Sequence, residues 1–270
     1  MILLALCPPV IAAPPQHIMS LKLCNDELLM DLVPPQRIAS ISYLSREKAA
    51  LKIWPEAAQI AVNHNTAEEV LAVHPDLILT DEFTTPAMRV MLAQSGAKLV
   101  AVPEAQNFDQ IRAVTRLLAD AVGARPRAEA LIARMDETLR RLAASAPRRP
   151  IRVAGWGGGG FVPGRDGLFN SVLVAAGGQS IEGGYYDVES LIAARPELLA
   201  YGDNYSDSPS LRRDQNAHPV LLKLFAGRRI TYPSALYGCG LPQSADAAVA
   251  LRGALMAAMR SPAPFKSGTP

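Results

Sequence analysis

One unit of sequence occurs twice in this chain, and this repetition constrains the fold more than any other feature. The first copy reads EEVLAVHPDLILTD from Glu68 to Asp81, and the second reads ESLIAARPELLAYGD from Glu189 to Asp203. Each copy joins a stretch of helix-forming residues to a proline, an acidic residue and a short apolar run. Because the residue before a proline disfavours the helical conformation, each helix is expected to end there. The chain is therefore predicted to contain two similar units of helix and strand.

Apolar runs and amphipathic stretches alternate along the rest of the chain. Strands are predicted at residues 17–23, 37–42, 75–80, 98–102, 151–156, 196–202 and 228–233. Helices are predicted at residues 25–33, 66–74, 85–96, 107–123, 125–146, 168–178, 187–195, 218–227 and 244–259. This alternation is typical of an α/β fold whose mostly parallel sheets are covered by helices on both faces.

The long helix predicted between the two units allows two interpretations. It is either a rigid strut that joins two lobes or an ordinary crossover helix within one sheet. The strut interpretation divides the chain into an N-terminal αβ lobe at residues 18–122, a linking helix at 124–146 and a C-terminal αβ lobe at 150–270.

Composition excludes several classes of protein. The chain has 270 residues, of which 49% are hydrophobic and 19% charged, as in an ordinary globular protein. A net charge of +2, spread over both signs, does not suggest a nucleic-acid partner. No apolar run reaches the roughly 18 residues that a membrane-spanning helix needs.

The N-terminal residues MILLALCPPVIAA, at positions 1–13, are typical of a secretory signal that ends in small residues, although they lack a basic start. Removal of this segment would leave two cysteines, Cys24 and Cys239. In an exported protein two thiols favour one disulfide, and two separate buried thiols remain the alternative.

The ordered set of motifs resembles the substrate-binding proteins of ABC importers for cobalamin and ferric siderophores. The similarity covers about Leu21 to Met259, and the strand RIAS, the unit AEEVLAVHPDLIL, the long helix and the step GGQSI follow the order of that family. The resemblance implies two Rossmann-like αβ lobes joined by a single long helix, with the ligand cleft between them. It also implies a periplasmic protein that captures a metal chelate, catalyses no reaction and acts as a monomer without a cofactor of its own.

In that family one glutamate on each lobe pairs with arginines of the permease. By their place in the repeated unit, the matching residues are Glu68 and Glu189. Charge pairs of this kind also steer encounter between partners. The alternative is that each glutamate only stabilises the start of its helix through the helix dipole.

Candidate ligand-binding residues follow the predicted strands, because ligands of open α/β folds bind at the carboxyl ends of the strands. Aromatic rings are prominent among them, and rings offer large, stiff contact areas to a macrocycle or a catecholate. The candidates are Tyr43, Arg46, Asn63, His64, Phe83, Trp156, Phe161, Tyr185, Tyr186, Tyr205 and Tyr237. For Arg46 the alternative is a solvated side chain, and for His64 it is a role in capping the next helix.

Two other functions remain open. A bare zinc or manganese carrier would need several converging His and carboxylate ligands, and the chain has four histidines. A dinucleotide-binding enzyme would use Gly155, Gly157 and Gly160 as a GxGxxG motif with Glu182 as the ribose-binding acid. That motif should run straight into a helix, whereas FVPGRDG follows it here. Within the leading class the ligand is a ferric siderophore, cobalamin, heme or another chelate, and the scarcity of rings argues against cobalamin.

Overall fold

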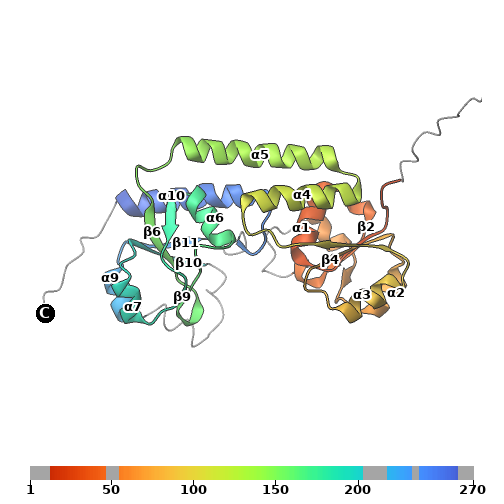
Figure 1. The fold of residues 1–270 in the computed structure, drawn as a ribbon, viewed down its shortest axis with the longest axis horizontal. Coiled ribbons are helices and arrows are strands. Elements are labelled where there is room, and N and C mark those ends of the chain that lie inside the picture. Colours follow the sequence, from red (N-terminus) through yellow and green to blue (C-terminus); the bar gives the residue numbers. More distant parts are fainter. Residues whose placement is uncertain (1–12, 47–54, 203–217, 233–236, 261–270) are drawn as a thin grey trace, which may run out of the picture.

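The computed structural model describes residues 13–46, 55–202, 218–232 and 237–260, which form two αβ lobes joined by one long helix (Figure 1). The predicted signal segment, except for Ala13, lies outside the described residues, and so does Tyr205.

The first lobe is built on a five-stranded parallel sheet with the strand order β3-β2-β1-β4-β5. The strands are β1 (Ile18–Ser20), β2 (Ile38–Ser42), β3 (Val62–Asn63), β4 (Leu77–Asp81) and β5 (Lys98–Val102). The helices are α1 (Leu23–Leu32), α2 (Ala67–Val73), α3 (Pro86–Ala93) and α4 (Phe108–Val122). Three 3₁₀ turns complete the lobe, η1 (Pro35–Arg37), η2 (Tyr43–Arg46) and η3 (Pro55–Gln59).

The second lobe has a four-stranded parallel sheet with the order β11-β10-β6-β8 and a two-stranded antiparallel ribbon of β7 and β9. The strands are β6 (Ile151–Gly155), β7 (Phe161–Val162), β8 (Gly178–Ser180), β9 (Gly184–Tyr185), β10 (Leu198–Gly202) and β11 (Arg229–Tyr232). The helices are η4 (Gly158–Gly160), α6 (Leu168–Ala175), α7 (Val188–Ala193), α9 (Pro219–Leu224) and α10 (Ser244–Arg260).

Helix α5 (Arg125–Ala144) runs along one side of the molecule from the first lobe to the second, beside α4 and α10 (Figure 1). Its buried residues Leu131 and Met135 belong to one apolar cluster that also contains Ile18 of the first lobe and Val153 of the second. The strut interpretation is therefore confirmed, and the long helix is not a crossover within one sheet.

The two copies of the repeated unit have matching helix ends. Thr66 caps α2 by accepting a hydrogen bond from the backbone N–H three residues on, and Asp187 caps α7 in the same way. At the other end, His74 and Arg195 both adopt the left-handed conformation, with φ angles of 49° and 51°. The sequence repeat therefore encodes the same start and the same stop for each helix.

The acidic residue after each proline joins its own strand to the neighbouring strand. Asp76 accepts a hydrogen bond from the backbone N–H of His17 at 3.0 Å, just before β1. Glu197 accepts one from the backbone N–H of Arg152 at 3.0 Å, in β6. Because β4 pairs with β1 and β10 pairs with β6, the two carboxylates occupy equivalent places in the two sheets.

Each apolar run of the repeat is buried on both faces of its sheet. Leu77 and Leu198 lie in the cluster shared by both lobes, whereas Ile78 and Leu199 face separate clusters on the other side. Strands buried on both faces read as continuous apolar runs, which explains why neither run alternates with polar residues.

Candidate ligand-binding cleft

The carboxyl ends of the parallel strands carry most of the residues predicted to bind a ligand. Tyr43 follows β2, His64 follows β3 and Phe83 follows β4 in the first lobe. Trp156 follows β6 and Tyr237 lies beyond β11 in the second. The structure groups some of these side chains on the surface and buries others.

A cavity of about 120 Å³ lies where the two lobes meet, and we call it the junction cavity. Its first-lobe wall includes Lys22, Asp81 and Glu104, which follow β1, end β4 and follow β5. Its second-lobe wall includes Gly240 and Leu241. Ligands of open α/β folds bind at the carboxyl ends of the strands, and each of these three charged residues stands within two residues of a strand end. The sequence could therefore have identified them, but the prediction favoured aromatic residues.

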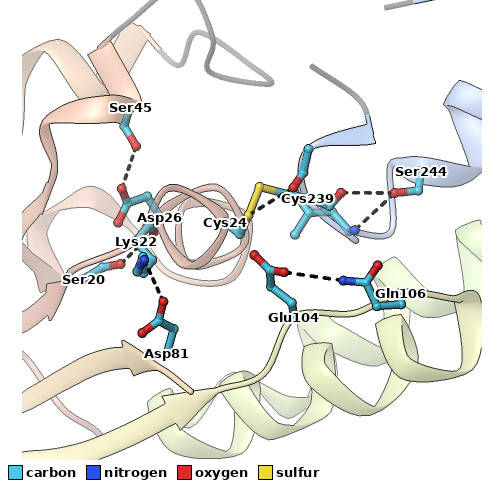
Figure 2. Close-up of a disulfide and its surroundings, with 12 residues drawn as sticks. Ser20, Lys22, Cys24, Asp26, Ser45, Asp81, Glu104, Gln106, Cys239 and Ser244 are labelled. Carbon is cyan, nitrogen blue, oxygen red and sulfur yellow. Dashed lines mark hydrogen bonds and ion pairs between the residues drawn. A yellow bond between two sulfur atoms is a disulfide. The ribbon is translucent and has the colours of Figure 1, made fainter. Parts of the chain in front are cut away.

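Two residues that line the junction cavity form an ion pair. The Lys22 Nζ lies 2.7 Å from Oδ2 of Asp81 (Figure 2). The Thr84 hydroxyl donates to Oδ1 of Asp81 at 2.7 Å. Although burial opposes ionisation, the hydrogen bonds from Lys22 and Thr84 keep the pKa of Asp81 below its usual value. The Lys22 side chain remains 46% exposed.

His64 and Tyr43 form one surface group at neighbouring strand ends. Their rings stack with centroids 5.1 Å apart and an angle of 19° between the planes. The Nδ1 atom of His64 lies 3.1 Å from Oε1 of Glu69, and the His64 backbone N–H donates to Oε2 of Glu69 at 2.9 Å. The His64 side chain is 62% exposed, and among the described residues its Nε2 has no hydrogen-bond partner.

Glu69 is held ionised at this place. Partial burial raises its pKa, but hydrogen bonds from His64 and from the cap residue Thr66 outweigh that effect and lower the pKa to about 2. An ionised Glu69 can only accept a hydrogen bond, so this contact favours the tautomer of His64 that carries its N–H at Nδ1, and in that tautomer the ring lone pair lies on the exposed Nε2. Thr66 and Glu69 form the capping box of α2, and His64 joins it through its two hydrogen bonds to Glu69, so the capping role expected as the alternative for His64 stands beside a ligand-binding role.

A second exposed aromatic group belongs to the second lobe. Phe161 and Tyr185 are paired across the ribbon of β7 and β9, and their ring centroids are 5.5 Å apart. Tyr185 is 82% exposed. Phe83 of the first lobe is also exposed, as a single ring.

Several predicted ligand residues have partners inside the protein instead. Trp156 and Asn63 are each 1% exposed, so neither offers side-chain surface to a ligand in this structure. Tyr237 is half-buried against Phe169 and Tyr232, and burial raises the pKa of its phenol.

Two further candidates are held by backbone carbonyl groups. The Tyr186 hydroxyl donates to the carbonyl of Glu182 at 2.8 Å. Arg46 is exposed, but its guanidinium donates to the carbonyls of Ala58 and Ile60. Arg46 therefore connects η2 to η3 and to the residue that follows η3 closely.

The glycine-rich loop after β6 does not lead into a helix. Gly158–Gly160 form a single 3₁₀ turn, and the chain then enters the strand β7. A dinucleotide-binding loop places its pyrophosphate on the N-terminus of a following helix. The enzyme interpretation of Gly155, Gly157 and Gly160 is therefore wrong, and the loop instead carries the exposed ribbon.

Cys24 and Cys239 form a disulfide with their Cα atoms 5.3 Å apart, as the paired-cysteine interpretation predicts (Figure 2). Cys24 stands in the first turn of α1, and Cys239 stands between β11 and α10. The bond therefore joins the first lobe to the second at the wall of the junction cavity.

Glu68 and Glu189 occupy the second position of α2 and α7. Both are exposed, and neither forms a hydrogen bond or ion pair with another described residue. Figure 1 places α2 and α7 in different lobes, on the side of the molecule away from α5.

The described residues contain no group of three or more His, Cys, Asp or Glu side chains placed to hold a metal ion. Within the same part of the chain, every helix is too short or too polar to span a bilayer.

Comparison with known proteins finds one family and many similar structures. Residues 18–187 match the family model described as "Periplasmic binding protein". A search of curated protein sequences found no match.

Similar solved structures include RhuT, a periplasmic heme-binding protein from Roseiflexus sp. RS-1, with a TM-score of 0.74 and 22% identity over 90% of this chain and 99% of that one. A periplasmic heme-binding protein from Pseudomonas aeruginosa has a TM-score of 0.67 and 22% identity, with 95% of each chain covered. The periplasmic vitamin B12 binding protein BtuF of Vibrio cholerae has a TM-score of 0.69 and 17% identity over 92% of this chain and 99% of that one.

Proposed function

The chain belongs to the periplasmic binding protein family, whose members bind solutes and are not enzymes, and we propose that its solute is a planar iron chelate of the heme class. The observation that carries this proposal is His64, an exposed imidazole at a strand end whose Nδ1 is held by an ionised carboxylate. A chelate with an open axial position on its metal accepts one such nitrogen.

The environment of His64 suits it to bind a metal through Nε2. Histidines that bind metals usually donate their other ring N–H to a carboxylate or carbonyl, which sets the tautomer and makes the ligating nitrogen more basic. Glu69 supplies that carboxylate, and Tyr43 supports one face of the ring. A single protein ligand is enough here, because the chelate itself fills the equatorial positions of the metal.

The exposed rings suit the flat, apolar faces of such a ligand. Tyr43 and Phe83 stand on the first lobe, and Phe161 and Tyr185 stand on the second. Aromatic side chains bury large areas and favour offset stacking on other π systems. Several of the similar structures are described as heme-binding, which supports the same class, while one is described as binding vitamin B12.

The test is a titration of the purified, disulfide-bonded protein with hemin, followed by absorption spectroscopy. We expect the wild-type protein to bind hemin saturably. We expect His64→Ala to change the absorption spectrum of the bound iron and to lower the affinity for hemin at least about tenfold, which is the loss expected when a metal ligand or its supporting partner is removed. His17→Ala is the matched control, since His17 is also exposed and its ring forms no hydrogen bond, ion pair or ring contact with a described residue.

Parallel titrations with cobalamin, a ferric catecholate, a ferric hydroxamate and zinc chloride separate the alternatives. Binding of a ferric siderophore without hemin would refute the heme class and keep the chelate function. Stabilisation by zinc alone would refute the chelate function. An unchanged hemin spectrum in His64→Ala would refute the assignment of His64.

We also propose that the loaded protein docks on an ABC permease outside the cytoplasmic membrane through Glu68 and Glu189. The matched positions of the two carboxylates, one in each lobe, support a partner with two similar halves. We expect Glu68→Ala with Glu189→Ala to weaken binding to the permease in nanodiscs and to leave hemin affinity unchanged.

The control for docking is Asp109→Ala, since Asp109 is an exposed carboxylate on α4. Equal permease binding by the glutamate variant and this control would contradict the docking role. A loss of hemin affinity in the glutamate variant would instead assign the two residues to the ligand site.

A further inference from the structure

The disulfide between Cys24 and Cys239 joins one lobe to the other, and both cysteines lie far from α5 in the sequence. The two cysteines are separated by 215 residues, and their bond links the first helix of the first lobe to the segment before the last helix of the second. Between the lobes, α5 is the connection through the main chain. The disulfide is thus a second covalent connection, beside the cavity.

We propose that this disulfide is a positioning element that holds the two lobes at one separation, so that the ligand-binding surfaces of the cleft are preorganised. The proposal rests on the proposed function only in locating the ligand between the lobes. Its first observation is that Cys24, Gly240 and Leu241 line the junction cavity together with Lys22 and Asp81. A change in the separation of the lobes at the bond would therefore change the walls of that cavity.

The residue after Cys239 is fitted closely to the first lobe. A Cβ atom at Gly240 would overlap the carbonyl oxygen of Ala105, so only glycine allows this approach. Close by, the Ser171 hydroxyl of the second lobe donates to the carbonyl of Gln106 at 3.1 Å. The segment before α10 and helix α6 therefore both lie against the connection between β5 and α4.

The segment that carries Cys239 is itself anchored. The backbone N–H of Leu241 donates to the Ser244 hydroxyl at 3.2 Å, and the backbone N–H of Ser244 donates to the carbonyl of Leu241 at 2.9 Å. Cys24 is part of α1, which packs in the buried cluster shared by both lobes. The bond therefore connects α1 to a segment that is hydrogen-bonded to the first residue of α10.

Without the bond, the lobes would remain joined by α5, by the apolar cluster that both lobes share and by the contacts at Gly240 and Ser171. A broader range of lobe separations would then be populated, and ligand affinity would fall with the fraction of molecules that keep the binding separation. If that fraction falls to about one tenth, the apparent affinity falls about tenfold. The expected signature of a positioning role is thus a wider distance distribution together with weaker binding.

The test measures the lobe separation directly by single-molecule fluorescence transfer. Dyes are attached through azide-bearing residues at the exposed positions Val90 in α3 and Val220 in α9, which avoids thiol chemistry. The oxidised protein is compared with the protein reduced by tris(carboxyethyl)phosphine and with Cys24→Ala/Cys239→Ala. Hemin affinity is measured on the same samples, and circular dichroism selects conditions in which each is folded.

We expect a narrow distance distribution for the oxidised protein, a broader one for both unbonded forms, and about tenfold weaker hemin binding in those forms. The reductant should change nothing in Cys24→Ala/Cys239→Ala, which controls for its other effects. Identical distributions in bonded and unbonded protein would overturn the proposal. Broader distributions with unchanged affinity would also overturn it, because the bond would then restrain the lobes without positioning the site.

Failure of the proposed function would look different. If hemin does not bind to the oxidised protein, the chelate found in the parallel titrations replaces it in the affinity measurement. The distance measurement needs no ligand, so its result decides the restraint in either case.

Discussion

The disulfide makes a quantitative prediction about stability that is separate from its effect on the cleft. We expect Cys24→Ala/Cys239→Ala to lower the free energy of unfolding, because the bond lowers the conformational entropy of the unfolded chain. The bond closes a loop of 215 residues, for which the chain-entropy relation predicts a loss of about 5 kcal/mol at 25 °C. This figure is an upper value, because residual structure in the unfolded chain reduces it.

The assay is guanidinium unfolding of the oxidised wild type, the reduced wild type and the double variant. Reduction of the wild type removes the cross-link and keeps both sulfur atoms, so it isolates the loop term from the loss of buried side chain at Cys239. The denaturant slope should rise in both unbonded forms, because their unfolded chains expose more surface. A difference between oxidised and reduced wild type below about 1 kcal/mol would refute the reasoning, since loss of a native disulfide typically costs about 2–5 kcal/mol.

Four further results are expected from substitutions in the two lobes. Burial raises the pKa of Asp26 well above its usual value. Asp26 therefore destabilises the folded protein increasingly as pH rises from the ordinary carboxylate pKa towards the raised one. Asp26→Asn should raise the melting temperature at pH 7 more than at pH 4. The hydrogen bonds from Arg149 lower the pKa of Glu197, so the stability that ionised Glu197 adds is complete above the ordinary carboxylate pKa and is lost as pH falls below it. Glu197→Gln should therefore weaken the dependence of the free energy of unfolding on pH in the acid range. An unchanged dependence would contradict this. Leu198→Ala, at a fully buried position, should cost about 2–5 kcal/mol in chemical denaturation. Gly240→Ala should lower the melting temperature through its clash with Ala105, and a wild-type value would show that the contact yields easily.

Most helices and strands were predictable from local patterns. Both copies of the repeat fold as a capped helix and a buried strand. The signals for these elements are local: the cap residue, such as Thr66, the residue before each proline and the apolar run each affect only residues close by in the sequence. The strands β3, β7, β8 and β9 were missed or absorbed into other segments, since two or three residues carry no periodic signal.

The candidate site was predictable only in part. The sequence indicated which loops follow strands, and so it identified His64 and Tyr43. It did not indicate that Trp156 turns into the core or that Lys22 and Asp81 form an ion pair in the wall of the junction cavity. Burial and pairing depend on which helices cover a sheet, and no local pattern contains that information.

By itself, the sequence determined the kind of fold. A duplicated helix and strand, each with its own start, stop and acidic contact to a neighbouring strand, builds two similar lobes, because these interactions are local or join adjacent strands. Only the tertiary structure decided how the lobes meet. The disulfide, the close approach at Gly240 and the junction cavity each combine residues more than a hundred positions apart, and such contacts exist only once both lobes have folded and α5 has placed them together.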